Sequence, residues 1–93
     1  GNLEIDSERY TVTFNGNPIK LTPNEFKLLF ILAGRPGQTL TREQLLEDLH
    51  GAASSIDRSV DSHIKNLRKK LEAESGGPSI ETVYGIGYRF IER

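Results

Sequence analysis

The segment DRSVDSHIKNLRKKLEAE, residues 57–74, is the most informative part of the sequence, because it predicts one long helix with two unlike faces. At about 100° per residue, its large apolar side chains fall in one narrow stripe. These side chains are Val60, Ile64, Leu67 and Leu71. The opposite face carries basic and small polar side chains, namely Arg58, Ser62, Lys65 and Lys69, with Asn66 and Ser59 on one flank. The stretch therefore predicts a helix that buries its apolar stripe and presents basic and polar groups outward.

Two shorter helices are predicted ahead of this stretch, within a helical region spanning 22–75. Thr22-Pro23-Asn24-Glu25 combines an N-cap threonine, a proline at the first helical position and a glutamate that completes a capping box. The apolar residues that repeat after it are Phe26, Leu29, Phe30 and Ala33, and Gly34 is the expected stop. Thr41-Arg42-Glu43-Gln44 is a second capping box and opens a short helix containing Leu45, Leu46 and Leu49.

Strand patterns flank the helices on both sides. Residues 1–21 alternate apolar and polar side chains over 3–6, 9–14 and 18–21, which predicts an antiparallel meander with one apolar face. Residues 79–92 predict a hairpin whose connection is Gly85-Ile86-Gly87. The expected fold class is therefore α+β: a winged helix-turn-helix with an N-terminal antiparallel β-sheet, a three-helix core and a C-terminal β-hairpin wing.

Length and composition limit the classes of protein. The chain has 93 residues, which suits one domain spanning 1–93, and it has no cysteine, which excludes a disulfide framework and a cysteine-based zinc site. No apolar run is long enough for a membrane span, so no membrane partner is expected. The two histidines, His50 and His63, fit no metal-ligand or catalytic pattern, so neither an enzyme nor a cofactor is predicted.

The charge is unevenly distributed. The net charge is −1, which argues mildly against nucleic acid. Residues 1–8, however, carry only acids, whereas residues 58–70 carry five bases and one acid. A short helix, a longer basic helix and a hairpin follow the order of a helix-turn-helix with a wing. Two interpretations stay open: double-stranded DNA binding with helix 57–74 in the major groove, or a winged-helix protein-interaction module that does not bind DNA.

Four motifs, in unbroken order along the chain, resemble the OmpR/PhoB family of response regulators. They are LTPNEFKLL (21–29), GQTLTREQLL (37–46), RSVDSHIKNLRKKL (58–71) and IETVYGIGYRF (80–90). Their residues are most similar to those of the BaeR-like branch. The resemblance implies a DNA-binding effector domain with a four-stranded N-terminal sheet, a recognition helix in the major groove and a wing at the adjacent minor groove.

Candidate DNA-binding residues follow from the outward helix face and from the resemblance in the wing. They are Arg58, Ser59, Ser62, Lys65, Asn66, Arg68, Lys69, Thr82, Tyr84 and Arg89. Arg68 lies near Asp61 on the helical wheel, so a pairing of these two is an alternative to a DNA contact for Arg68. Tyr84 stands where many relatives carry an arginine. His63 is expected to pack at the core edge, and Tyr88 and Phe90 are expected to anchor the wing.

The resemblance also implies partners. Relatives bind direct-repeat operators, and some contact RNA polymerase through the loop that corresponds to residues 50–56. In the family, a receiver domain that a sensor kinase controls precedes the effector domain. A cytoplasmic bacterial protein is therefore expected. In this chain the loop is small and neutral, and His50 replaces the tryptophan that is frequent at that position.

Overall fold

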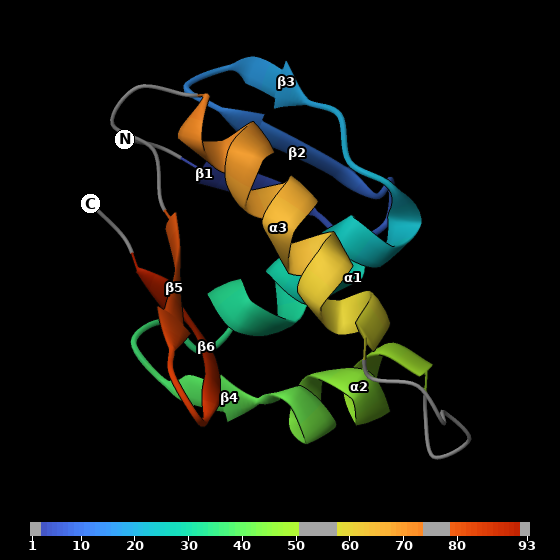
Figure 1. Cartoon of the computed structure of the whole chain (residues 1–93). Helices are drawn as coiled ribbons and strands as arrows, with labels where there is room; N and C mark the ends of the chain where they lie inside the picture. The colour runs from blue at the N-terminus through green and yellow to red at the C-terminus, as the bar shows by residue number, and fades with distance from the viewer. Residues whose placement is uncertain (1–2, 51–57, 74–78, 92–93) are drawn as a thin grey trace.

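The computed structural model describes residues 3–50, 58–73 and 79–91. Its elements are β1 (Leu3–Asp6), β2 (Thr11–Phe14), β3 (Asn17–Ile19), α1 (Pro23–Ala33), β4 (Thr39–Thr41), α2 (Arg42–His50), α3 (Arg58–Glu72), β5 (Ser79–Val83) and β6 (Gly87–Ile91). In Figure 1, α3 crosses the molecule between the sheet of β1, β2 and β3 and the β5–β6 hairpin. This is the α+β winged helix-turn-helix that the sequence predicts.

The N-terminal sheet has the strand order β1-β2-β3 and is antiparallel throughout. Its register sets Leu3 opposite Phe14 and Ile5 opposite Val12. Because side chains alternate between the two faces of a sheet, these residues share the face that packs on the core. The resemblance implies a four-stranded N-terminal sheet, but this sheet has three strands in the part of the chain that the structure describes. The next strand, β4, pairs with β6 in a second sheet instead.

Helix α1 begins as its capping box predicts. The N–H of Glu25 donates to Thr22 Oγ1 at 3.2 Å, and the N–H of Thr22 donates to Glu25 Oε1 at 3.0 Å. The expected apolar face needs one correction, because Phe30 is half exposed whereas Leu28 and Leu32 are fully buried. The reason is that α1 contacts α2, α3 and β6 through a face centred on Leu28, Leu29 and Leu32, so Phe30 lies at the edge of that face, where its ring stacks on Phe26.

Strand β4 was not predicted, and it attaches the wing to the helical core. It pairs antiparallel with β6, so that the second sheet has the order β4-β6-β5. Gly87 makes this pairing possible: a Cβ at that position would lie only 1.9 Å from the carbonyl oxygen of Leu40. A glycine is therefore required where β6 meets β4.

The apolar stripe of α3 is the centre of the core. Val60, Ile64, Leu67 and Leu71 are each at most 1% exposed. They pack within one cluster with buried side chains from the other elements, among them Val12, Phe26, Leu28, Leu29, Leu32, Leu40, Leu45, Ile80, Tyr88 and Phe90. Helix α3 ends at Glu72, close to the expected end, whereas its expected N-cap, Asp57, lies outside the described residues.

Truncation of Leu67 should test this packing. Leu67→Ala leaves a cavity in a fully buried position, so the free energy of unfolding should fall by about 2–5 kcal/mol. Urea denaturation followed by circular dichroism measures the change. Lys65→Ala, on the exposed face of the same helix, is the control and should stay within about 0.5 kcal/mol of the parent.

Candidate nucleic-acid interface

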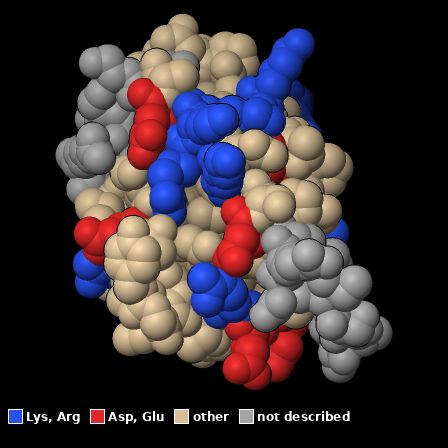
Figure 2. All heavy atoms as spheres, in the orientation of Figure 1, with Lys and Arg blue, Asp and Glu red and all other residues tan. Residues whose placement is uncertain are grey.

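The outward face of α3 carries the candidate contact residues in the arrangement that the sequence predicts. Ser62, Lys65, Asn66 and Lys69 are all exposed, because the stripe on the other side of the helix is buried. Figure 2 shows lysine and arginine side chains gathered over α3 on this face of the molecule. Arg58 and Ser59 belong to α3, but their side chains lie outside the described part of the structure, as do residues 51–57 of the expected polymerase loop and the side chain of His50.

Arg68 joins the recognition helix to the wing. Its Nη2 atom donates a hydrogen bond of 2.7 Å to Thr82 Oγ1 in β5. Both residues are half-buried, so this contact lies along the seam between helix and hairpin. Two of the predicted DNA contacts are thus brought together, and the bond fixes where the wing stands relative to α3.

Asp61 does not pair with Arg68, which corrects one of the two alternatives for that residue. Seven residues along a helix correspond to about 10.5 Å of rise, which separates the two side chains by two turns. Arg42 Nε, at the start of α2, instead donates to Asp61 Oδ1 at 2.8 Å. The hydroxyl of Tyr88 in β6 donates to the same oxygen, and the Arg42 guanidinium lies 5.8 Å from the centre of the Tyr88 ring.

The charges of this cluster reinforce one another. Burial raises the pKa of Asp61, but the hydrogen bonds from Tyr88 and Arg42 and the Arg42 charge outweigh it, so the pKa lies below its ordinary value. Burial, and then the Asp61 carboxylate, raise the pKa of the Tyr88 hydroxyl. At neutral pH the aspartate is therefore ionised and the phenol protonated, and the cluster holds α2, α3 and β6 together.

Arg42 is the positioning residue that sequence reasoning missed. The signal available was a basic residue at the first position of a capped helix, directly after Thr41. Its partner, however, lies 19 residues further along the chain. No local pattern links those two positions, so only the packing of α2 against α3 shows the pair.

The wing carries an exposed tip on a neutral stem. Arg89 forms an ion pair with Glu81, which lies directly opposite it in the β5–β6 register. Tyr84, in the turn, is 89% exposed, and Ile86 beside it is 53% exposed. The expectation that Tyr88 and Phe90 anchor the wing is confirmed, because both are at most 5% exposed.

A second polar cluster ties α1 to α3. Lys70 Nζ donates to Glu25 Oε1 at 2.6 Å, and only 3% of the Glu25 side chain is exposed. Burial raises the pKa of Glu25, but the hydrogen bonds from Lys70 and from the Thr22 N–H, with the charges of Lys70 and His63, bring it below its ordinary value. His63 is half-buried as expected, with its Nε2 3.3 Å from Asn24 Nδ2.

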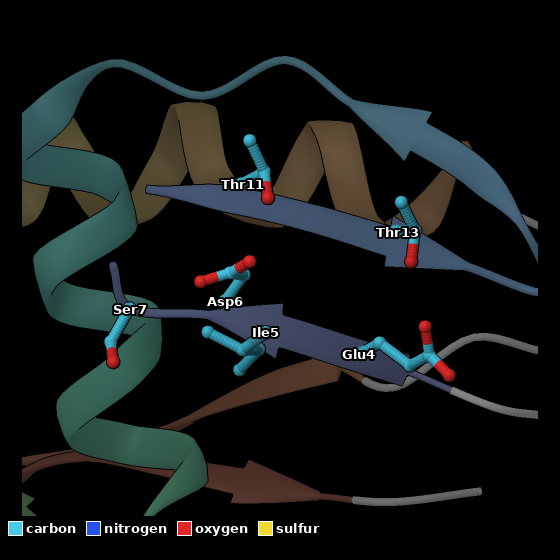
Figure 3. Close-up of a pocket in the computed structure, with 6 residues that line it drawn as sticks. All are labelled: Glu4, Ile5, Asp6, Ser7, Thr11 and Thr13. Atoms are coloured by element: carbon cyan, nitrogen blue, oxygen red, sulfur yellow. The ribbon is translucent and has the colours of Figure 1, made fainter. Parts of the chain in front are cut away.

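Elsewhere, the described residues hold no group of three or more side chains suited to a metal ion. No helix among them is long and apolar enough to cross a bilayer. A shallow depression of about 450 Å³ lies on the N-terminal sheet and is lined by Glu4, Ile5, Asp6, Ser7, Thr11 and Thr13 (Figure 3). Asp6 has a structural role there, because Oδ1 accepts from the N–H groups of Glu8 and Arg9 and closes the turn after β1.

Comparison with known proteins places the chain among transcriptional regulators. Residues 16–90 match the family described as "Transcriptional regulatory protein, C terminal". The chain is similar to transcriptional regulatory protein BaeR of Escherichia coli O6:H1, with 47% identity over 95% of this chain and 38% of BaeR. It is also similar to transcriptional regulatory protein YclJ of Bacillus subtilis, with 48% identity over 95% of this chain and 39% of that protein. The chain thus spans about two fifths of the length of these relatives.

Solved structures show the same likeness. The AdeR DNA-binding domain, in complex with an intercistronic region, superimposes with a TM-score of 0.85 at 31% identity, covering 100% of this chain and 96% of that domain. The RstA DNA-binding domain of Klebsiella pneumoniae, in complex with the RstA box, superimposes with a TM-score of 0.82 at 39% identity. The match covers 98% of this chain and 92% of that domain. Both of those domains were solved bound to DNA.

The link between Glu25 and Lys70 should make stability depend on pH. Because the folded-state pKa of Glu25 is lowered, its stabilisation is present above the unfolded-state pKa, about 4.3, and is lost as pH falls through the folded value. At pH 7, Glu25→Gln should therefore lower the free energy of unfolding by about 1–3 kcal/mol relative to the parent. This difference should shrink below pH ~4. Urea denaturation at a series of pH values measures it.

Glu47→Gln, which removes an exposed carboxylate on α2, is the matched control. It should track the parent at every pH. If Glu25→Gln lowered the free energy of unfolding equally at pH 3 and at pH 7, the role given to the Glu25 charge would be contradicted, because the destabilisation would then not depend on the ionised carboxylate.

Proposed function

The chain belongs to the family of transcriptional regulatory protein C-terminal domains, the OmpR/PhoB type that its motifs indicate, and on that premise we propose that it binds double-stranded DNA sequence-specifically to regulate transcription. One observation carries the proposal. In a chain of net charge −1, α3 carries five of the twelve bases, and two of these, Lys65 and Lys69, lie on its exposed side opposite the buried stripe. A local basic face of this kind attracts phosphates whatever the net charge of the domain.

The dimensions and side chains of α3 suit the major groove. Its 15 residues span about 22 Å, and the groove of B-form DNA admits one helix. Asn66 has the amide that can pair with adenine, and Lys65 can donate to guanine or to a phosphate. Ser62 and Lys69 flank these two on the exposed face, where they would contact bases or backbone.

The remaining contacts are proposed around this centre. Arg58 and Ser59, at the first turn of α3, would hold phosphate at one end of the recognition helix. Thr82, Tyr84 and Arg89 would bring the wing to the adjacent minor groove. The hydrogen bond between Arg68 and Thr82 supports this division, because it holds the wing beside α3 and leaves Arg68 at the junction of the two.

The wider role is proposed from the family. As one domain spanning 1–93, the chain would act as the effector part of a longer, cytoplasmic response regulator whose receiver domain answers to a sensor kinase. Its operator would be a direct repeat. RNA polymerase would be contacted through the loop at residues 50–56.

A protein-interaction module that does not bind DNA is the second candidate, and the net charge of −1 favours it. A salt series separates the two. Retention of this domain by a duplex, falling steeply as salt concentration rises, supports DNA binding. Failure to bind any duplex at low salt would favour the protein-interaction module.

The recognition face should be sensitive to single substitutions. Lys65→Ala and Asn66→Ala should each weaken binding to a selected operator by about 1–3 kcal/mol if the side chain reads a base. Lys65→Ala should also flatten the slope of log affinity against log salt by about 0.9, whereas Asn66→Ala should leave the slope unchanged because it removes no charge. Fluorescence anisotropy across a salt series measures both quantities.

Arg9→Ala is the charge-matched control, because Arg9 is an exposed base in the turn after β1, where its side chain pairs with Asp6. It should bind as the parent does. Unchanged affinity of both α3 variants, with circular dichroism of the parent, would refute the assignment of this face.

Operator geometry should follow head-to-tail binding. We expect selection from random duplexes to yield a direct repeat whose half-sites lie about one helical turn, ~10–11 base pairs, apart. Sequencing of the selected pool reads the spacing and orientation. An inverted palindrome as the consensus would contradict this arrangement.

A further inference from the structure

His63 lies at the edge of the exposed face of α3, where the buried apolar stripe gives way to polar side chains. Its side chain is half-buried, and Asn66, three residues further along the helix, is exposed. Residues three apart on a helix have Cβ atoms about 5–6 Å apart. Salt at 0.1 M screens charges only beyond about 10 Å, so a charge on this imidazole would act on phosphates bound beside Asn66.

Helix α1 holds the imidazole in place. Nε2 of His63 lies 3.3 Å from Nδ2 of Asn24, in the first turn of α1. An unprotonated Nε2 accepts a hydrogen bond from this amide N–H, and a protonated Nε2 donates to the amide oxygen once the amide group has turned over. The ring can therefore take up a proton without leaving the seam between α1 and α3.

The charged groups beside His63 are already paired with each other. The buried Glu25 carboxylate, whose pKa the charge of His63 helps to lower, accepts from Lys70 Nζ at 2.6 Å. Lys27, one turn beyond Asn24 on α1, is the next base along this flank and is half-buried. A proton on His63 therefore adds positive charge to the seam, because the neighbouring carboxylate is neutralised by its own lysine.

The other elements that pack on α3 bring their charges to its opposite flank. Arg42 of α2 pairs with Asp61, and Arg68 donates to Thr82 of β5. At about 100° per residue, Asp61 and Arg68 lie on the far side of the apolar stripe from His63. These charges therefore do little to offset a charge on the imidazole.

We propose that His63 makes DNA binding respond to pH: the imidazole, held by Asn24 at the edge of the exposed face of α3, takes up a proton as pH falls and thereby strengthens binding to the operator. The inference rests on the DNA binding proposed above and adds a means of regulating it. Histidine ordinarily changes its charge between pH 5 and 8, whereas the phosphates of DNA stay negative over that range. Operator occupancy would therefore rise as the surroundings of the protein become more acidic.

Fluorescence anisotropy on one selected duplex at pH 6 and at pH 8, in 0.1 M salt, tests the proposal. The parent should bind about three- to eightfold more tightly at pH 6, the upper value being the contribution of one neutralised phosphate at that salt concentration. Its slope of log affinity against log salt should be steeper at pH 6, by up to about 0.9. His63→Gln keeps a hydrogen-bonding group for Asn24 but no titratable one, so it should bind equally at both pH values.

His50→Gln is the matched control, because His50 and His63 are the two histidines of the sequence. This variant should keep the pH response of the parent. His63→Lys, which carries a charge at both pH values, should bind at pH 8 about as tightly as the parent binds at pH 6. Thermal unfolding of each variant at both pH values checks that the fold is kept.

Calorimetry in two buffers that differ in ionisation enthalpy measures the proton directly. If protonation of His63 favours DNA binding, DNA binding must favour protonation by the same factor. The parent should therefore take up a fraction of a proton when it binds the duplex near pH 6.5, and His63→Gln should lack that uptake. A purely structural role of His63 would not produce this difference.

Three results would overturn the proposal. They are equal affinity of the parent at both pH values, a pH response that His63→Gln retains, or a pH response that His50→Gln loses. Lys65→Ala separates this failure from failure of the proposed function. If Lys65→Ala still flattens the salt slope at pH 8, DNA binding through α3 stands and only the role of His63 falls.

Discussion

Both sheets and the other two helices pack around the buried apolar stripe of α3. The four apolar side chains of α3 lie at the centre of the cluster that joins both sheets and the other two helices. Because a helix can present only one face to a core, burying this stripe determines which residues face outward. The stripe thus stabilises the fold and, by the same geometry, exposes Lys65 and Asn66.

Two polar clusters then fix the neighbours of α3 at its two ends. Near its start, Asp61 accepts from Arg42 of α2 and from Tyr88 of β6. Near its end, Lys70 donates to the buried Glu25 of α1. Apolar packing alone is tolerant of small rotations, whereas hydrogen-bonded charges have defined geometry. The clusters therefore orient the helix-turn-helix and hold the hairpin at a fixed position beside the recognition helix.

Pairing of charges within the molecule divides the bases into two groups. Arg42, Lys70 and Arg89 are held by carboxylates of the domain itself, and Arg68 is held by a hydroxyl. Lys65 and Lys69, on the exposed face of α3, point to solvent. A count of basic residues in the sequence treats both groups alike. This is why the net charge of −1 is a poor guide to the surface that α3 presents.

The features that depend on near neighbours could be predicted from the sequence alone: the strand alternation, both capping boxes, the stripe of α3, the exposure of its polar face and the glycine turn of the wing. The partners of the charged side chains and the role of β4 depend on the folded arrangement of distant segments. Asp61 binds Arg42 rather than Arg68, and Glu25 binds Lys70, across 19 and 45 residues of chain. β4 joins β6 although its three residues alternate over too short a run to predict a strand. Helical period, capping and turns act over three or four residues and leave a local signature, whereas contacts between distant segments form only once the core has set the elements side by side.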